Sequence, residues 1–72
     1  MTDKELAHLI KMANQITANL AYGDAAELSA TRVSNHITRF WAASMKSKIL
    51  NYAKCDGSDL HEITRIAVLQ LS

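Results

Sequence analysis

Hydrophobic residues recur along this chain at helical spacing, and two glycines divide the pattern into segments. In the first segment the apolar positions follow at three- and four-residue intervals, as on one stripe of a helix. These positions are Leu6, Leu9, Ile10, Ala13, Ile16 and Leu20. Thr2 or Asp3 is suited to cap the helix start, and Gly23 can adopt the left-handed conformation that ends a helix. We predict a first helix over about 3–20.

The middle of the chain carries two further stripes. The residues from Asp24 to Glu27 have the spacing of a capping box, which marks a helix start. The stripe after it is Ala26, Ala30, Val33, Ile37, Phe40 and Trp41. The next is Met45, Ile49, Tyr52 and Ala53, and this segment ends at Gly57. Ser44 is suited to cap a separate helix, whereas Ala42 and Ala43 favour one continuous helix, so both arrangements stay open.

The last segment begins at Asp59 with a second capping box, formed by Asp59 and Glu62. Its inner face is Leu60, Ile63, Ala67 and Leu71. All seven acidic residues lie near proposed helix ends, where the helix dipole favours negative charge in a first turn. Because stripes, caps and charges agree, we predict an all-α fold. The expected architecture is a compact bundle of three to four short helices in a single domain over residues 1–72.

The composition limits how such a chain is stabilised. A chain of 72 residues buries only about 60% of the surface that its unfolded form exposes. The one cysteine, Cys55, excludes an intramolecular disulfide and fits a reducing compartment. No apolar run reaches the roughly 18 residues of a membrane span, and residues 1–5 do not resemble a signal peptide. We expect a cytoplasmic protein, with no membrane segment, that depends on regular helix packing or a partner.

Residues with catalytic or metal-binding chemistry are few and dispersed. None of His8, His36 and His61 has a His or Cys two to four positions further on. The chain contains no CxxC, HExxH or glycine-rich phosphate loop. His8 and His61 fall on the solvent side of the predicted helices, and Cys55 is expected to be a small apolar filler. We therefore expect no catalytic residues, no metal site, no cofactor and no enzymatic activity of its own.

A basic stretch lies between Glu27 and Asp56, where the chain has no acidic residue. On a helical projection Leu28, Arg32, Asn35 and Arg39 share the face opposite the core. Such a face can contact nucleic-acid phosphates, but two or three aligned cations give weak, salt-sensitive binding. A solvated surface or a face for an acidic protein explains the same residues. A small nucleic-acid-binding regulator that uses Arg32, Arg39 and Lys46 is kept as an alternative.

Apolar side chains outside the stripes indicate a protein-binding surface. Met12 flanks the first stripe, Leu28 lies outside the second, and the last helix is apolar on nearly every side. Ile66 and Leu69 belong to that last helix. A helix that is apolar all round is buried all round, and clustered exposed apolar side chains mark interaction sites. We expect an interface here, and a free-standing homodimer is one way to form it.

Asn14, Gln15 and Trp41 have two interpretations each. Asparagine is modestly unfavourable inside a helix, so a polar contact between helices or with a partner would account for Asn14. Gln15 lies beside it in the same helix interior. Trp41 ends its stripe next to an uncertain helix boundary. It is either a core anchor or a binding hot spot for a partner, and both stay open.

Two stretches of this sequence resemble a known family. Residues 8–16 (HLIKMANQI) and 36–41 (HITRFW), followed by Met45, are similar to the delta subunit of soluble NAD-dependent formate dehydrogenases. Gly57 and Leu60 also follow the order of that family. The motif positions are His8, Met12, Asn14, Gln15, His36, Phe40, Trp41 and Met45. One departure is clear, because the family usually has Asp-Pro where this chain has Ala42-Ala43.

The resemblance implies an accessory subunit that binds and stabilises, or helps to assemble, a molybdenum- or tungsten-dependent formate dehydrogenase. The expected partner is the catalytic subunit, and the redox cofactors, flavin and NAD site would belong to other subunits. From the resemblance and the surface pattern together, we expect a set of partner-binding residues. They are Met12, Asn14, Gln15, Leu28, Arg32, Arg39, Trp41, Ile66 and Leu69.

Overall fold

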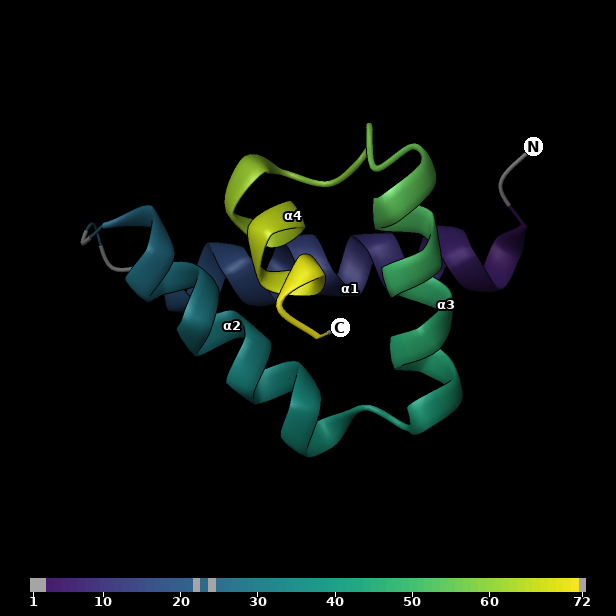
Figure 1. The fold of residues 1–72 in the computed structure, drawn as a ribbon, viewed down its shortest axis with the longest axis horizontal. Coiled ribbons are helices and arrows are strands. Elements are labelled where there is room, and N and C mark those ends of the chain that lie inside the picture. The colour runs from purple at the N-terminus through teal and green to yellow at the C-terminus, as the bar shows by residue number, and fades with distance from the viewer. Residues whose placement is uncertain (1–2, 22, 24, 72) are drawn as a thin grey trace.

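The computed structural model describes residues 3–21, 23 and 25–71, and these residues form four α-helices (Figure 1). The helices are α1 (Lys4–Leu20), α2 (Ala26–Phe40), α3 (Ala43–Cys55) and α4 (Glu62–Leu69). The predicted all-helical class is confirmed. α1 lies behind the other helices in Figure 1, and α4 lies in front of it between α2 and α3. α4 contacts all three other helices, so it closes the core.

The core forms where the predicted stripes face one another. Val33 and Ile37 from α2, Ile49 from α3 and Val68 from α4 are all fully buried. Leu9 and Ala13 supply the α1 side of the same cluster. The radius of gyration is 11.0 Å, which agrees with the value of about 11 Å for a compact domain of this length. The described residues therefore pack as one compact unit.

The start of α1 is held by side chains, as the sequence predicted. The Asp3 carboxylate accepts a hydrogen bond of 2.6 Å from the backbone N–H of Leu6. Lys48 Nζ from α3 lies 3.0 Å from Asp3 Oδ2 and 3.4 Å from Glu5 Oε1. The Leu6 hydrogen bond and the Lys48 ammonium lower the pKa of Asp3, and the hydrogen bond to Asp3 raises the pKa of Lys48. Thr2, the other candidate cap, lies outside the described residues.

The break between the second and third helices falls at Trp41 and Ala42. Trp41 has an extended backbone (φ −93°, ψ 143°), and Ala42 follows with φ −66° and ψ 153°. The chain therefore has two helices here and not one. The N-cap of α3 is Ala42, which makes no side-chain cap hydrogen bond, and Ser44 lies inside the helix. Ser44, which was one candidate for the cap, is not the N-cap because the helix begins before it.

Two members of the second predicted stripe are not in the core. Ala26, the first residue of α2, is exposed, and Phe40, the last, is 70% exposed. Both lie at the ends of α2. The extended backbone of Trp41 places its indole in the core instead, with only 9% exposed. α2 begins after Ala25 without a side-chain cap, and the expected cap, Asp24, lies outside the described residues.

The last helix begins later than predicted. α4 starts at Glu62 after His61 as N-cap, so Asp59 does not open it and the predicted capping box is wrong. The loop before α4 is ordered by other contacts, because the Asp59 N–H donates to Tyr52 Oη at 2.9 Å. Gly57 has φ 66°, and an added Cβ would lie 3.1 Å from Ala53 O. This loop therefore needs glycine at its turn.

Candidate functional site

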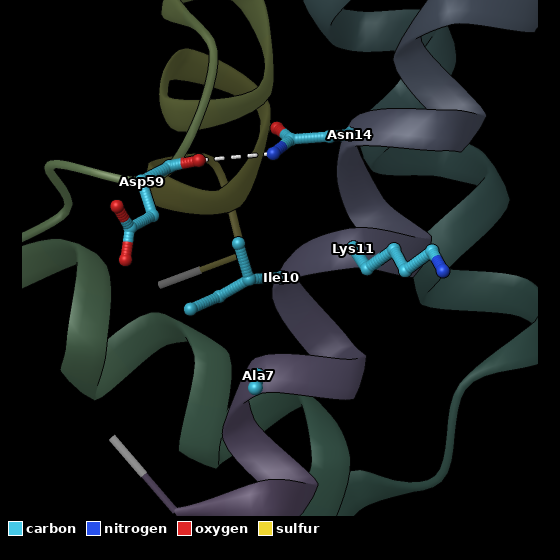
Figure 2. A pocket seen from close by; sticks show the side chains of 5 residues that line it. All are labelled: Ala7, Ile10, Lys11, Asn14 and Asp59. Atoms are coloured by element: carbon cyan, nitrogen blue, oxygen red, sulfur yellow. Dashed lines mark hydrogen bonds between the residues drawn. The ribbon is translucent and has the colours of Figure 1, made fainter. Parts of the chain in front are cut away.

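Asn14 joins α1 to the loop that precedes α4 (Figure 2). Its Nδ2 donates to Asp59 O and its Oδ1 accepts from the His61 N–H, both at 2.9 Å. His61 is the N-cap of α4, and in a capping box the N–H of this position is satisfied by a side chain from the first turn of the helix itself. Asn14 takes that role from a distant helix. Of the two interpretations of Asn14, the contact between helices is the one that the structure contains.

The two hydrogen bonds of Asn14, to Asp59 and His61, form a clasp between α1 and the α4 loop. A groove of about 410 Å³ borders this clasp. Its lining is Ala7, Ile10, Lys11, Asn14 and Asp59. Figure 2 shows Ala7, Ile10 and Asn14 along α1 with Asp59 opposite, while Lys11 extends away from Asp59. The floor is mostly apolar, and one ammonium and one carboxylate of opposite sign stand at the rim. This lining suits an apolar side chain of another protein. The five lining residues do not include a nucleophile paired with a general base, so they do not form a catalytic arrangement.

A buried hydroxyl pair lies further along α1. Thr17 Oγ1 and Thr64 Oγ1 are 2.6 Å apart, and the two residues are 5% and 0% exposed. Thr17 also donates to Ala13 O at 3.2 Å, so in this arrangement Thr64 is the donor within the pair. We did not predict this contact. The helical period alone would have found Thr17, which lies seven residues after the buried Ile10.

The outer face of α2 combines exposed apolar and basic side chains. Leu28 is 60% exposed and Phe40 70% exposed. The Phe40 ring lies against His36, with 4.8 Å between ring centroids, and Arg39 Cζ lies 5.9 Å from the Phe40 centroid. A groove of about 290 Å³ runs beside them. Its lining is Leu20, Arg32, Asn35, His36, Arg39 and Phe40.

Arg32 ties this face to the end of α1. Its Nη1 donates to Leu20 O at 2.6 Å, and Leu20 is the last residue of α1. The last carbonyl groups of a helix have no partner within the helix, so a guanidinium beside them is favourable. Arg32 is half-buried as a result. It therefore helps to shape the groove on α2 in addition to carrying positive charge.

The predicted partner-binding residues do not form one surface. Leu28, Arg32 and Arg39 lie along the outer face of α2, as the helical projection predicted. Met12 and Ile66 are half-buried and pack against the core. The remaining members are Asn14 in its clasp, Gln15 exposed on α1, Trp41 buried, and Leu69 37% exposed on α4.

The residues with reactive side chains are spread out. His8 and His61 are exposed, as predicted. Cys55 is also exposed, so the prediction of an apolar filler was wrong. It is the last residue of α3, where Tyr52 and Ala53 already occupy the inner face. In the part of the chain that the structure describes, no cluster of three or more His, Cys, Asp or Glu side chains could hold a metal ion.

The fold and these surfaces define a small all-helical protein whose exposed features are a basic, aromatic helix face and an apolar groove. Residues 8–68 match the family of the NADH-dependent formate dehydrogenase delta subunit, FdsD, and the chain belongs to that family. No curated protein and no solved structure matches it. Within the described ranges, no helix combines the length and the apolar composition that a bilayer crossing requires.

Proposed function

We propose that this chain is an accessory subunit that binds the catalytic subunit of a formate dehydrogenase and stabilises the assembled enzyme. Membership of the delta subunit family over residues 8–68 is the observation that carries the proposal. The surface chemistry supports it, because Phe40 exposes apolar area beside the basic side chain of Arg39, and Leu28 is exposed further along the same helix. Exposed apolar area next to charge is typical of a protein-binding surface.

The mechanism is stabilisation by binding. A subunit that binds only the folded or cofactor-loaded partner shifts the folding and loading equilibria toward that state. At a free concentration one hundred times its Kd, such a subunit adds about 2.7 kcal/mol to the stability of the bound state. This role needs a complementary surface and no redox centre in the chain itself.

The experiment compares formate dehydrogenase purified with and without this chain from otherwise identical cells. The tagged chain is first used to recover its partners from nuclease-treated native lysate, and bound proteins are identified by mass spectrometry. We expect the catalytic subunit and formate-dependent NAD reduction in the eluate, and none with the tag alone. We also expect the enzyme lacking the chain to show faster thermal inactivation or lower cofactor content. An enzyme with equal activity, cofactor content and half-life in both preparations would exclude the role.

The nucleic-acid alternative has less support on this structure. Of the basic residues between Glu27 and Asp56, Lys48 pairs with Asp3 and Glu5, and Arg32 donates to the end of α1. Few aligned cations are left on the outer face of α2 for phosphates, and phosphate contacts supply most non-specific affinity. Retention on heparin with a steep loss of binding as salt rises would favour this alternative over the accessory subunit.

A further inference from the structure

Phe40 occupies a position that folding alone does not explain. It is 70% exposed, whereas the next residue, Trp41, is 9% exposed. The Phe40 ring nevertheless has two neighbours on its own helix, because His36 packs against it and Arg39 lies over it. A ring held in one orientation loses little conformational entropy when it enters a pocket of a partner. Phe40 therefore has the properties of a pre-ordered anchor.

Among the described residues that line the groove beside Phe40, the charged side chains are arginines. Residues 28–55 contain no carboxylate, and Arg32 and Arg39 line the groove beside the ring. The groove on α1 differs, since Lys11 and Asp59 place both signs at its rim. The groove between α2, α3 and Leu71 carries Lys46, but its apolar members Leu50 and Leu71 are half-buried. Only on the α2 groove, among the described residues, does a large exposed ring lie beside an exposed guanidinium, that of Arg39.

We propose that the outer face of α2 is the docking surface of this chain on formate dehydrogenase. The surface consists of Leu28, Arg32, Asn35, His36, Arg39 and Phe40. The partner surface that covers it is an apolar pocket of the catalytic subunit, and carboxylates surround this pocket. Phe40 inserts into the pocket, and Arg39 pairs with the carboxylates at its rim. Guanidinium–carboxylate pairs set orientation and association rate, and a buried aromatic anchor supplies affinity. This inference rests on the proposed function and names the face that performs it.

The test measures the affinity of the purified chain for formate dehydrogenase isolated from cells that lack the chain. Phe40→Ala removes the anchor. Leu69→Ala removes a 37% exposed apolar side chain from α4, and it tests the competing face, because the sequence pattern placed Leu69 among the partner-binding residues. We expect Phe40→Ala to raise Kd by roughly thirtyfold, as loss of a hot-spot residue does. Leu69→Ala is expected to change Kd by less than about threefold. Circular dichroism of each variant establishes that the helices are intact.

A second pair of variants tests the charge. Arg39→Glu reverses a guanidinium on the α2 surface, and Lys11→Glu makes the same change on the exposed side of α1. We expect Arg39→Glu to raise Kd about tenfold or more and to flatten the dependence of the association rate on salt. Lys11→Glu is expected to leave both nearly unchanged. The comparison of Arg39→Glu with Lys11→Glu tests the docking surface even if Phe40→Ala alters the fold.

The outcomes separate the docking face from the function. If the unmodified chain binds the enzyme and both Phe40→Ala and Arg39→Glu bind equally well, the docking face is wrong while the accessory role stands. Loss of binding in Leu69→Ala or Lys11→Glu alone would move the interface to α4 or α1. If light scattering shows a dimer that Phe40→Ala converts to a monomer, the occupant is a second copy. Absence of any binding by the unmodified chain overturns both proposals.

Discussion

α1 and α2 are similar in length and each has one buried stripe, but their other side chains differ in what they contact. Three polar side chains of α1 and its N-cap make contacts within the molecule: Asp3 caps the helix, Asn14 holds the α4 loop and Thr17 pairs with Thr64. On the outer face of α2, Phe40 and Leu28 are exposed, and Arg39 lies beside Phe40.

This difference shows that residue type alone does not separate stabilising positions from binding positions. An asparagine inside a helix is a structural residue here, and a phenylalanine at a helix end is a surface residue. What decides each case is whether another element covers the position. Changes at the polar positions of α1 that contact other elements should therefore reduce the free energy of unfolding, and a change at an exposed position of α2 such as Phe40 should leave it nearly intact.

The largest effect is expected for Asn14→Ala. The change removes both hydrogen bonds to the α4 loop and leaves the His61 N–H without its partner. At about 1 kcal/mol for each hydrogen bond, we expect a loss of about 2 kcal/mol. Urea unfolding followed by circular dichroism measures it. The matched control is Gln15→Ala, at the exposed neighbouring position, with an expected change within about 0.5 kcal/mol. Equal stabilities for the two variants would mean that the clasp does not stabilise the fold.

Next in size is Thr17→Val, which leaves the buried Thr64 hydroxyl without its hydrogen-bond partner. An unsatisfied buried hydroxyl costs about 1–3 kcal/mol, and we expect the lower half of that range. The double variant Thr17→Val, Thr64→Val replaces both hydroxyls by methyl groups of similar shape. It should therefore lose less stability than the single change. A double-mutant cycle on the unfolding free energies checks this expectation, and strictly additive losses would contradict it.

A gain of stability is expected at the start of α3. Ala42 is an N-cap with extended backbone and no side-chain hydrogen bond. Ala42→Asp should stabilise the protein by about 1 kcal/mol, because its carboxylate can accept an N–H of the first turn. Ala42→Asn supplies the cap without the charge, so the difference between the two variants isolates the dipole contribution. A thermal melting temperature unchanged in both would show that water already satisfies this helix start.

The sequence was sufficient to predict the helices but not all of their ends. Buried positions such as Val33 and Ile37 recur with the helical period of 3.6 residues, and this period can be recognised from neighbouring residues alone. The predicted capping box at Asp59 failed because the loop is ordered by Tyr52 and Asn14, which come from other helices. Contacts between residues 45 positions apart in the chain cannot be deduced from a four-residue motif.

The candidate site was predictable in part for a similar reason. The projection placed Leu28 and Arg39 on one outward face, and the structure agrees. It assigned Phe40 to the core because a projection assumes a continuous helix, and the helix ends at that residue. Phe40 is exposed, whereas Trp41, for which both interpretations were open, has an extended backbone and is buried in the core. The sequence alone was therefore not sufficient to predict which of these two aromatic side chains at the helix end is buried.

The smallest effect is expected from the ion pair at the start of α1, and it depends on pH. The Leu6 hydrogen bond and Lys48 lower the pKa of Asp3 in the folded state. A carboxyl with a lowered folded pKa stabilises the protein above its unfolded pKa, and this contribution disappears as pH falls through the folded pKa. The pair is solvent-exposed, so the contribution is small. Asp3→Asn keeps a capping oxygen and removes the titration. Its unfolding free energy should therefore vary less with acid pH than that of the unmodified chain. A carboxyl pKa of Asp3 at its ordinary value, measured by NMR titration, would mean that neither the cap nor Lys48 favours the charged form.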